Sequence, residues 1–177
     1  MLILPATPID RDDIDNLLDT AFGPGRHART ASLLRAGAMP VVGPSLVARF
    51  GANLLGSVQY WPIVLVSDDV LTPLTLLGPV AVAASARKLG LGRRLIGASL
   101  TIADAAGLDP ILLIGDLSYY GQFGFDSSLT SDWTLPGPVE RHRLLLRHTG
   151  NGLPPSIADV RPIHDSLPAA RVPILVR

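Results

Sequence analysis

The sequence contains no cysteine among its 177 residues. This excludes disulfide bonds, thiolate metal ligands and a cysteine nucleophile, and it is compatible with a reducing compartment. Charged residues are also scarce, at 17% of the chain, whereas hydrophobic residues make up 47%. This composition is typical of a packed globular protein and excludes extensive disorder. The length fits one domain with a full hydrophobic core.

The chain also carries no net charge, because its fifteen basic and fifteen acidic side chains cancel. The chain therefore lacks the excess of basic residues that is typical of a general nucleic-acid-binding protein. It also lacks a polybasic patch for binding a membrane. The apolar stretch from Val70 to Val82 is interrupted by Pro73 and Pro79 and is too short to cross a bilayer. The first residues show neither the positive region nor the long apolar run of a signal peptide. We expect a cytoplasmic protein.

Several catalytic patterns are absent. The sequence has no Gly-x-Ser-x-Gly nucleophile elbow. A dinucleotide-binding fingerprint needs three glycines and a later acid, whereas the loop from Arg87 to Gly92 has two glycines and begins with arginine. The four histidines are spread too widely for a metal-binding helix, so we expect no metal site: they are His27, His142, His148 and His164.

The spacing of apolar residues predicts helices and strands along the whole chain. Helices are expected after Thr7, where Pro8 and Asp10 form a capping pattern, and again further along the chain, from His27 to Arg35 and from Leu91 to Ala106. Strands are expected at Leu2 to Ala6, Leu46 to Phe50, Leu54 to Val66, Leu74 to Val82, Ile111 to Ile114, Trp133 to Leu135 and Arg141 to Arg147. The last thirty residues contain five prolines and no clear period, which indicates an extended segment.

The most informative stretch runs from Leu76 to Phe125. In it an apolar strand leads into Arg87-Lys88-Leu89-Gly90-Leu91-Gly92, which opens an amphipathic helix. The free N–H groups and the positive dipole end of such a helix attract phosphate oxygens. Gly90 and Gly92 carry no side chain that would keep a phosphate away, and basic side chains surround the same point. The loop alone also fits an ordinary glycine-containing turn.

Two further motifs flank this loop in a matching order. Gly78-Pro79-Val80-Ala81-Val82 precedes it, and Tyr119-Tyr120-Gly121-Gln122-Phe123-Gly124-Phe125 follows the next expected strand. With these three motifs the chain resembles the GNAT superfamily of acyl-CoA-dependent N-acetyltransferases, and most closely a bacterial branch of it. The early segments Ala21 to Arg26 and Thr30 to Gly37 are also similar to that branch. The resemblance covers about residues 1 to 147.

This resemblance implies an α+β fold, with a central mixed and strongly bent sheet flanked by helices in a single domain. Residues 1–147 would form the acetyltransferase domain, and residues 148–177 a proline-rich C-terminal extension packed on the same domain. In the family, a bulged strand pairs with the pantetheine arm of acetyl-CoA, and one N–H near Val82 stabilises the oxyanion of the tetrahedral intermediate. The following helix start holds the pyrophosphate. The implied acetyl-CoA-binding residues are Val80, Ala81, Val82, Arg87, Lys88, Leu89, Gly90, Leu91, Gly92 and Arg93.

The resemblance also implies that Tyr120, four residues before Gly124, is the catalytic proton donor. The thiolate that leaves when an amine attacks a thioester needs a proton, and a phenol with a reference pKa of about 10 can supply it. The alternative is that Tyr119, Tyr120, Phe123 and Phe125 only close the core, which is the interpretation we favour for Tyr119. Beside them, Gln122 replaces a residue that is often basic in the family, so a phosphate contact would be missing.

The sequence does not assign the general base or the residues of the acceptor pocket. Asp116, Asp68 and Asp69 are candidate bases, although acids at such positions commonly serve as turn or capping residues. An amine that loses its proton to ordered water would need no side-chain base. Arg26 and Arg29 fit either the recognition of an acidic acceptor or a solvated loop. Similarly, Tyr60 and Trp61 fit either the acceptor pocket or the core of a sheet.

The sequence thus predicts an N-acetyltransferase that moves an acetyl group from acetyl-CoA, as a co-substrate and without a metal, to an amine of an unidentified acceptor. The amine would attack directly in a ternary complex, because no side chain is placed to form a covalent intermediate. The alternative is a non-catalytic acyl-CoA-binding sensor or interaction module, since superfamily membership does not guarantee turnover. The apolar composition is compatible with a homodimer, and we expect no nucleic-acid or membrane partner.

Overall fold

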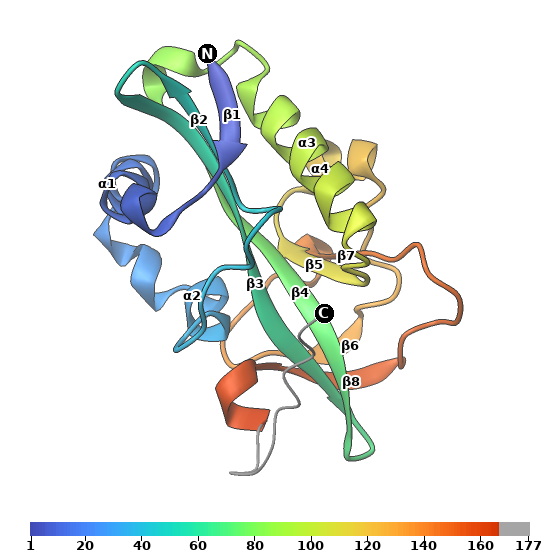
Figure 1. The fold of residues 1–177 in the computed structure, drawn as a ribbon. Coiled ribbons are helices and arrows are strands. Elements are labelled where there is room, and N and C mark those ends of the chain that lie inside the picture. Colours follow the sequence, from blue (N-terminus) through green and yellow to red (C-terminus); the bar gives the residue numbers. More distant parts are fainter. Residues whose placement is uncertain (167–177) are drawn as a thin grey trace.

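The computed structural model describes residues 1–166 of the chain, which form an α+β domain built around one eight-stranded mixed sheet (Figure 1). Six strands follow one another in the order β1-β2-β3-β4-β5-β7, while β8 pairs with β3 and β6 pairs with β8. The strands are β1 (Leu2–Pro5), β2 (Leu46–Phe50), β3 (Asn53–Ser67), β4 (Val70–Val82), β5 (Ile111–Ile114), β6 (Asp132–Thr134), β7 (Leu144–Arg147) and β8 (Ile157–Pro162). The helices are α1 (Arg11–Phe22), α2 (Thr30–Leu34), α3 (Leu91–Ala105) and α4 (Leu117–Tyr120).

The longest feature of the sheet is the antiparallel hairpin of β3 and β4, which runs diagonally through the molecule (Figure 1). Its tight turn places Asp68 and Asp69 at positive φ angles of 48° and 62°, as a two-residue hairpin turn requires. The two strands are rich in Val, Leu and Ile, which favour extended backbone. This hairpin is the scaffold on which the other strands and the helices are arranged.

The first half of β3 pairs with β2, and its second half pairs with β8. The sequence analysis expected no strand beyond Arg147, so β8 is a difference between expectation and structure. Along β8 the side chains of Ala158, Val160 and Pro162 are buried, whereas Asp159 and Arg161 between them are not. This alternation over a few residues, bounded by prolines, is too short to stand out in a proline-rich segment.

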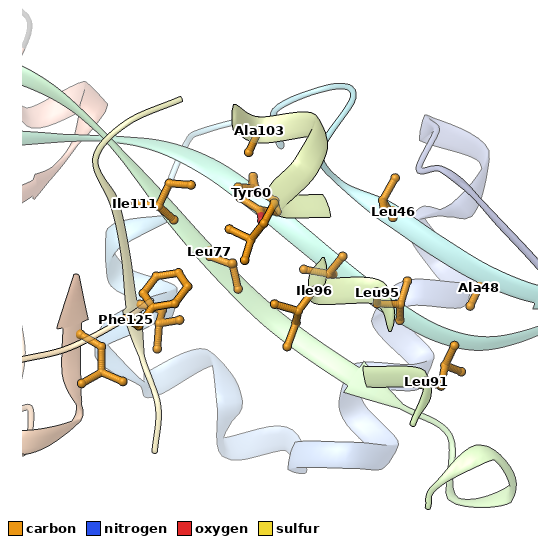
Figure 2. Packing of buried hydrophobic residues seen from close by; sticks show 14 of the residues in the cluster. Leu46, Ala48, Tyr60, Leu77, Leu91, Leu95, Ile96, Ala103, Ile111 and Phe125 are labelled. Carbon is orange, nitrogen blue, oxygen red and sulfur yellow. The ribbon is translucent and has the colours of Figure 1, made fainter. Parts of the chain in front are cut away.

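The helices cover both faces of the hairpin, and each face has its own apolar core. On one face α1 packs Ile14, Leu17 and Leu18 against Val47 and Ala81. On the other face α3 packs against the sheet in the larger cluster shown in Figure 2. The residues labelled there are Leu46, Ala48, Tyr60, Leu77, Leu91, Leu95, Ile96, Ala103, Ile111 and Phe125.

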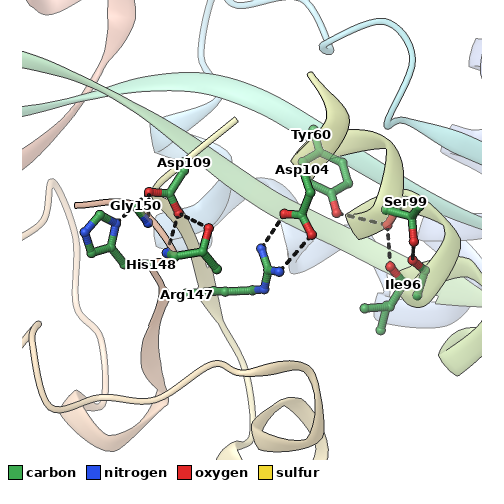
Figure 3. A network of polar contacts seen from close by, with 11 residues as sticks. Tyr60, Ile96, Ser99, Asp104, Asp109, Arg147, His148 and Gly150 are labelled. Atoms are coloured by element: carbon green, nitrogen blue, oxygen red, sulfur yellow. Dashed lines mark hydrogen bonds and ion pairs between the residues drawn. The ribbon is translucent and has the colours of Figure 1, made fainter. Parts of the chain in front are cut away.

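Polar contacts also tie α3 to the sheet (Figure 3). The hydroxyl groups of Tyr60 and Ser99 lie 2.9 Å apart, and both residues are fully buried. At the end of α3, Arg147 of β7 donates two hydrogen bonds to the carboxylate of Asp104, at 2.7 and 2.9 Å. Paired donors of this kind fix geometry as well as distance. The position of α3 relative to β3 and β7 is therefore set at both its middle and its end.

The predicted α+β class and the central mixed sheet are confirmed, and the expected helices and strands form with small shifts in their bounds. The region expected as one helix from His27 to Arg35 is a 3₁₀ turn, Pro24–Ala28, followed by α2. The division of the chain at residue 147 stays a prediction, and residues 167–177 of the predicted extension lie outside the described residues. Within residues 1–166, the longest helices are too short or too polar to pass through a bilayer.

Close packing of α3 on β3 at Gly56 gives a test of this arrangement. A Cβ on Gly56 would lie 2.9 Å from Leu95 Cδ1 and 3.2 Å from the backbone oxygen of Ala81. We expect Gly56→Ala to lower the free energy of unfolding by about 1–3 kcal/mol, because this core has no room for the methyl group. Chemical denaturation of both proteins measures the difference.

The matched control is Gly97→Ala, within α3, where an added Cβ meets no atom within 4 Å. Because alanine favours helix over glycine, this change should leave stability unaltered or raise it by up to about 1 kcal/mol. Equal effects of the two substitutions would contradict the packing described here.

Candidate active site

The sheet opens between its two central strands. The parallel strands β4 and β5 pair over only two positions, Thr75 with Ile111 and Leu76 with Leu112. Beyond Leu76, β4 continues for six residues, while β5 stays paired with β7 up to Ile114. The edge of β4 that faces β5 is thus left without a strand partner from Leu77 onward. A strand edge of this kind offers backbone donors and acceptors to a ligand.

A bulge lies at the start of this open edge. Val58 of β3 is opposite Val80, but Tyr60 is opposite Leu77, so β4 has one extra residue at Gly78–Pro79. Gly78 has a φ of +126°, which side chains of L-residues rarely allow. The resemblance implied a bulge in the strand of Val80 to Val82, and the structure has it directly before that segment.

The bulge reverses the direction of the backbone N–H groups that follow it. Before it, the N–H of Thr75 points toward β5 and donates to the carbonyl oxygen of Pro110 at 3.3 Å. After it, the N–H of Ala83 points toward β3 and donates to the oxygen of Leu55 at 2.8 Å. Because successive N–H groups of an extended chain alternate in direction, the N–H of Val82 faces the open side. An N–H near Val82 was predicted from the resemblance to stabilise an oxyanion, and this role stays a prediction.

The N-terminus of α3 carries the expected anion-binding loop. Gly90 caps the helix in the left-handed conformation, with a φ of +69°. The first helical hydrogen bond runs from Arg94 N–H to Gly90 O, so the N–H groups of the preceding helical residues have no helical partner. Arg87, Lys88, Arg93 and Arg94 are exposed around this end, and within residues 1–166 none of the four forms an ion pair with a carboxylate. The arrangement favours a phosphate group.

A cavity of about 950 Å³ lies beside the open edge of β4. Its lining comes from three parts of the chain: the region of α1 and α2, the bulged part of β4, and the segment from β5 to α4 with residues 138–143. Arg26, Arg29, Arg35, Asp116, Glu140 and Arg143 are the charged residues of the lining. A cavity of this size fits a substrate of moderate size.

Tyr119 and Tyr120 both line the cavity, with their ring centres 5.0 Å apart and their planes at 86°. A Cβ on Gly92 would lie 2.9 Å from the hydroxyl oxygen of Tyr119, so this side chain reaches the start of α3. The ring of Tyr120 lies against Gly115, where a Cβ would come within 2.4 Å of it. Tyr119, for which a core role was favoured, therefore also joins the cavity to the anion-binding loop.

Burial is the main cause that raises the pKa of Tyr120 to about 12; the neighbouring Tyr119 and Asp116 act in the same direction, whereas Arg143 acts in the opposite direction. The hydroxyl group therefore keeps its proton at neutral pH. A group that donates a proton in a reaction must hold it beforehand. This environment suits the donor role that the sequence analysis gave to Tyr120.

The three candidate bases lie in different places. Asp116 caps α4, lines the cavity and lies 3.3 Å from the Nε of Arg143. Asp68 and Asp69 form the turn at the far end of the β3–β4 hairpin and do not line the cavity. Their turn geometry explains them without a chemical role.

Two arginines named from the sequence have partners within the protein. Arg26 is buried and forms ion pairs with Asp15 and Asp19, at 3.0 and 2.7 Å. Arg29 is exposed, and its guanidinium lies 5.5 Å from the ring centre of Phe22. The sequence analysis missed Arg35 and Arg143, both of which line the cavity. Neither lies in a recognisable motif, so only the folded chain brings them to the site.

Three other side chains named in the sequence analysis, Gln122, Tyr60 and Trp61, make contacts within the protein. Gln122 donates a hydrogen bond to the backbone oxygen of Tyr119 at 2.7 Å, which caps the short α4. Tyr60 belongs to the core under α3, whereas Trp61 packs against a third apolar cluster, which includes Leu34, Ile63 and Trp133. Both therefore follow the core alternative, although Trp61 also contacts Arg35. Among residues 1–166, no group of three or more His, Asp or Glu side chains is placed to hold a metal ion.

Comparison with known proteins identifies relatives in sequence and in structure. The chain matches no family model. YhbS of Escherichia coli (strain K12), named as an uncharacterised N-acetyltransferase, is 29% identical over 133 residues, which cover 75% of this chain and 77% of YhbS.

Solved structures share the fold. The crystal structure of the GNAT family N-acetyltransferase YhbS from Escherichia coli in complex with CoA matches with a TM-score of 0.72 and 24% identity, covering 90% of this chain and 88% of that chain. A GNAT family acetyltransferase from Brucella melitensis in complex with acetyl-CoA matches with a TM-score of 0.66 and 26% identity, covering 90% and 94%. The resemblance predicted from the sequence is confirmed, whereas the roles of the single site residues stay predictions.

Titration of the tyrosines tests the surroundings of Tyr120. The chain has three tyrosines, and burial raises the pKa of each of them. We expect the ultraviolet absorbance of phenolate to show each ionisation at a pKa above the ordinary value of about 10 while the protein is folded. Tyr120→Phe should remove a component near the pKa of about 12.

The sign of the effect on stability follows from the same shift. The pKa of Tyr120 is higher in the folded than in the unfolded protein. The buried neutral phenol therefore contributes fully to the free energy of unfolding below a pH of about 10, and this contribution is lost as the pH rises toward 12. Tyr119→Phe serves as the control. A wild-type titration with a phenolate component at the ordinary pKa that Tyr120→Phe removes would contradict the burial of this ring.

Proposed function

We propose that this chain, an acyltransferase of the GNAT superfamily, transfers the acetyl group of acetyl-CoA to an amine by direct attack within a ternary complex. The observation that carries the proposal is the divergence of β4 from β5 next to the N-terminus of α3. Tyr119 contacts Gly92 at that helix end and also lines the cavity, so the anion-binding loop and the cavity are adjacent. A long molecule with a phosphate group at one end and a reacting group at the other fits this arrangement.

The residues present fit acetyl-CoA part by part. The free N–H groups of α3 and the exposed Arg87, Lys88 and Arg93 would hold the pyrophosphate. Gly90 and Gly92 leave the approach to these N–H groups clear. The unpaired edge of β4, from Val80 to Val82, would form hydrogen bonds with the amides of the pantetheine arm, as an added strand does. The thioester would then lie in the cavity next to Tyr120.

The chemistry then needs two proton movements. The amine nitrogen attacks the carbonyl carbon of the thioester, a C–N bond forms, the C–S bond breaks, and the amine loses one proton. The Val82 N–H, which faces the open side, would stabilise the negative charge on the carbonyl oxygen. Tyr120 would donate its proton to the departing sulfur, so that the products are the N-acetylated acceptor and CoA with a free thiol.

The phenolate left on Tyr120 regains a proton from solvent before the next cycle. For the proton released by the amine, Asp116 is the one of the three candidate acids that lines the cavity. An acceptor that arrives as a neutral amine transfers this proton to water. The homodimer, the cytoplasmic location and a small-molecule or protein acceptor stay predictions from the sequence.

Calorimetric titration with acetyl-CoA tests the binding site. We expect the wild type to bind, and the double variant Arg87→Ala, Gly90→Val to bind at least about tenfold more weakly, because one phosphate donor is lost and valine does not adopt the left-handed conformation of Gly90. Gly97→Ala, a change in the same helix where space is open, is the control and should bind like the wild type. A folded wild type that does not bind acetyl-CoA would refute the proposed function.

The role of Tyr120 is tested by its phenylalanine variant. We expect Tyr120→Phe to lower kcat by about 10²-fold or more while the Kd of acetyl-CoA changes little, since the hydroxyl acts on the leaving sulfur and not in binding. Release of free thiol from acetyl-CoA in the presence of a panel of primary amines measures the rate.

The neighbouring change Tyr119→Phe is the matched control and should retain most of the turnover. If the protein binds acetyl-CoA and acetylates no amine in an extended panel, the non-catalytic sensor replaces the enzyme. If Tyr120→Phe is as active as the wild type, another group supplies the proton.

A further inference from the structure

Arg35 is an unusual cation in the cavity. It follows directly after α2, its side chain is half-buried, and its guanidinium lies 5.4 Å from the ring centre of Trp61. Within the described part of the chain, one of its five N–H donors is used, in a hydrogen bond from Nη2 to Ser32 Oγ at 2.7 Å. Within residues 1–166 no carboxylate lies close enough to form an ion pair with it. A positive charge is thus held away from water without a neutralising partner.

The lack of a carboxylate partner within residues 1–166, combined with partial burial, distinguishes Arg35 from the other arginines of the cavity. Arg26 is neutralised by Asp15 and Asp19, and Arg143 lies within ion-pair distance of Asp116. Arg29 is exposed to solvent, which screens its charge. Arg35 is the half-buried arginine of the cavity lining that forms no ion pair within residues 1–166.

The charge of Arg35 persists at neutral pH. Burial lowers its pKa to about 10, and the positive charge of Arg26 acts in the same direction, whereas the negative charge of Asp15, which forms no ion pair with Arg35, acts in the opposite direction. Even so, the guanidinium stays protonated under physiological conditions. A charge that is partly desolvated and unpaired is unfavourable until an anion binds to it. The planar guanidinium also presents its N–H donors in a fork that suits paired hydrogen bonds to a carboxylate or phosphate.

Arg35 lines the same cavity as the groups proposed to take part in the reaction. Arg35 contributes to the cavity lining from the end of α2, while Gly78 to Val80 and Tyr120 contribute to the same lining from β4 and α4. An acceptor with its amine at the open edge of β4 therefore shares the cavity with Arg35. Its anionic group would be neutralised by the cation that the protein leaves unpaired.

We infer that Arg35 binds an anionic group of the acceptor, so that the acceptor is an amine that also carries a carboxylate or a phosphate. The inference rests on the proposed acetyl transfer, because it names the class of the acceptor at that same site. It assigns Arg35 to substrate binding and not to the chemical step.

Pairs of amines that differ only in their charge test this inference. The carboxylate arm compares 4-aminobutyrate with 4-aminobutanamide and glycine with glycinamide, and the phosphate arm compares phosphoethanolamine with ethanolamine. We expect the anionic member of at least one pair to have a kcat/KM at least about tenfold higher, because it pairs with the buried cation. Whichever arm shows the preference identifies the anion.

Substitution of Arg35 then connects the preference to this side chain. Arg35→Gln should raise KM for the anionic amine at least about tenfold, with kcat and the neutral amine little affected, and Arg35→Lys should restore part of the loss. Arg161→Gln is the matched control, because Arg161 lies on β8, pairs with Asp159 and does not line the cavity.

A binding measurement covers the case in which none of these amines is acetylated. Acetate and inorganic phosphate are titrated separately into the wild type and into Arg35→Gln while tryptophan fluorescence is followed, since Trp61 lies under the guanidinium. We expect a saturable change in the wild type with at least one anion, and its loss or at least about tenfold weakening in the variant. Acetyl-CoA should bind to both proteins equally.

The outcomes separate the two proposals. If acetyl-CoA binds, but no anion binds through Arg35 and no anionic amine is preferred, the inference about the acceptor is overturned and the proposed function remains. If acetyl-CoA does not bind, the proposed function fails, and the anion titration alone decides whether Arg35 is a binding residue. Equal anion binding by wild type and Arg35→Gln overturns the role of Arg35 in either case.

Discussion

A single extra residue in β4, at Gly78–Pro79, reverses the direction of the backbone N–H groups that follow it. In a regular strand the Val82 N–H would be used in pairing with β3, whereas here the neighbouring Ala83 takes that role. The bulge thereby decides which backbone donors face the side from which β5 has diverged, and Val82 is among them. In the proposed function, these open backbone groups bind the pantetheine arm and the oxyanion.

The helix that completes the site is positioned by packing and by polar contacts together. Gly56 lets Leu91 and Leu95 of α3 approach the backbone of β3 and β4 closely. Tyr60 and Ser99 fix the middle of α3, and the paired hydrogen bonds between Arg147 and Asp104 fix its end. Because the free N–H groups of a helix point along its axis, a fixed helix also fixes the direction in which an anion is bound.

Much of this could be predicted from the sequence, because the strong signals are local. The glycines of the loop before α3 and the apolar runs of β4 and β5 indicate their conformations directly, and the order of the motifs indicated the fold. The rest depends on contacts between distant segments. Arg35 is a lone arginine after a short helix, and only folding places it beside Trp61 and the cavity. Likewise β8 is a brief alternation whose burial depends on β3.

The pairing of β8 with the second half of β3 has a consequence for how the chain is made. Ile63 to Val66 pair with Asp159 to Pro162, so this part of the sheet joins segments almost a hundred residues apart. During synthesis on the ribosome, most of the fold emerges before β8, while the edge of β3 that pairs with β8 still has no strand partner. An apolar strand with an open edge readily pairs with other chains, so a nascent chain stalled before β8 would be prone to aggregate or to be captured by chaperones. Synthesis of β8 then covers the open edge of β3.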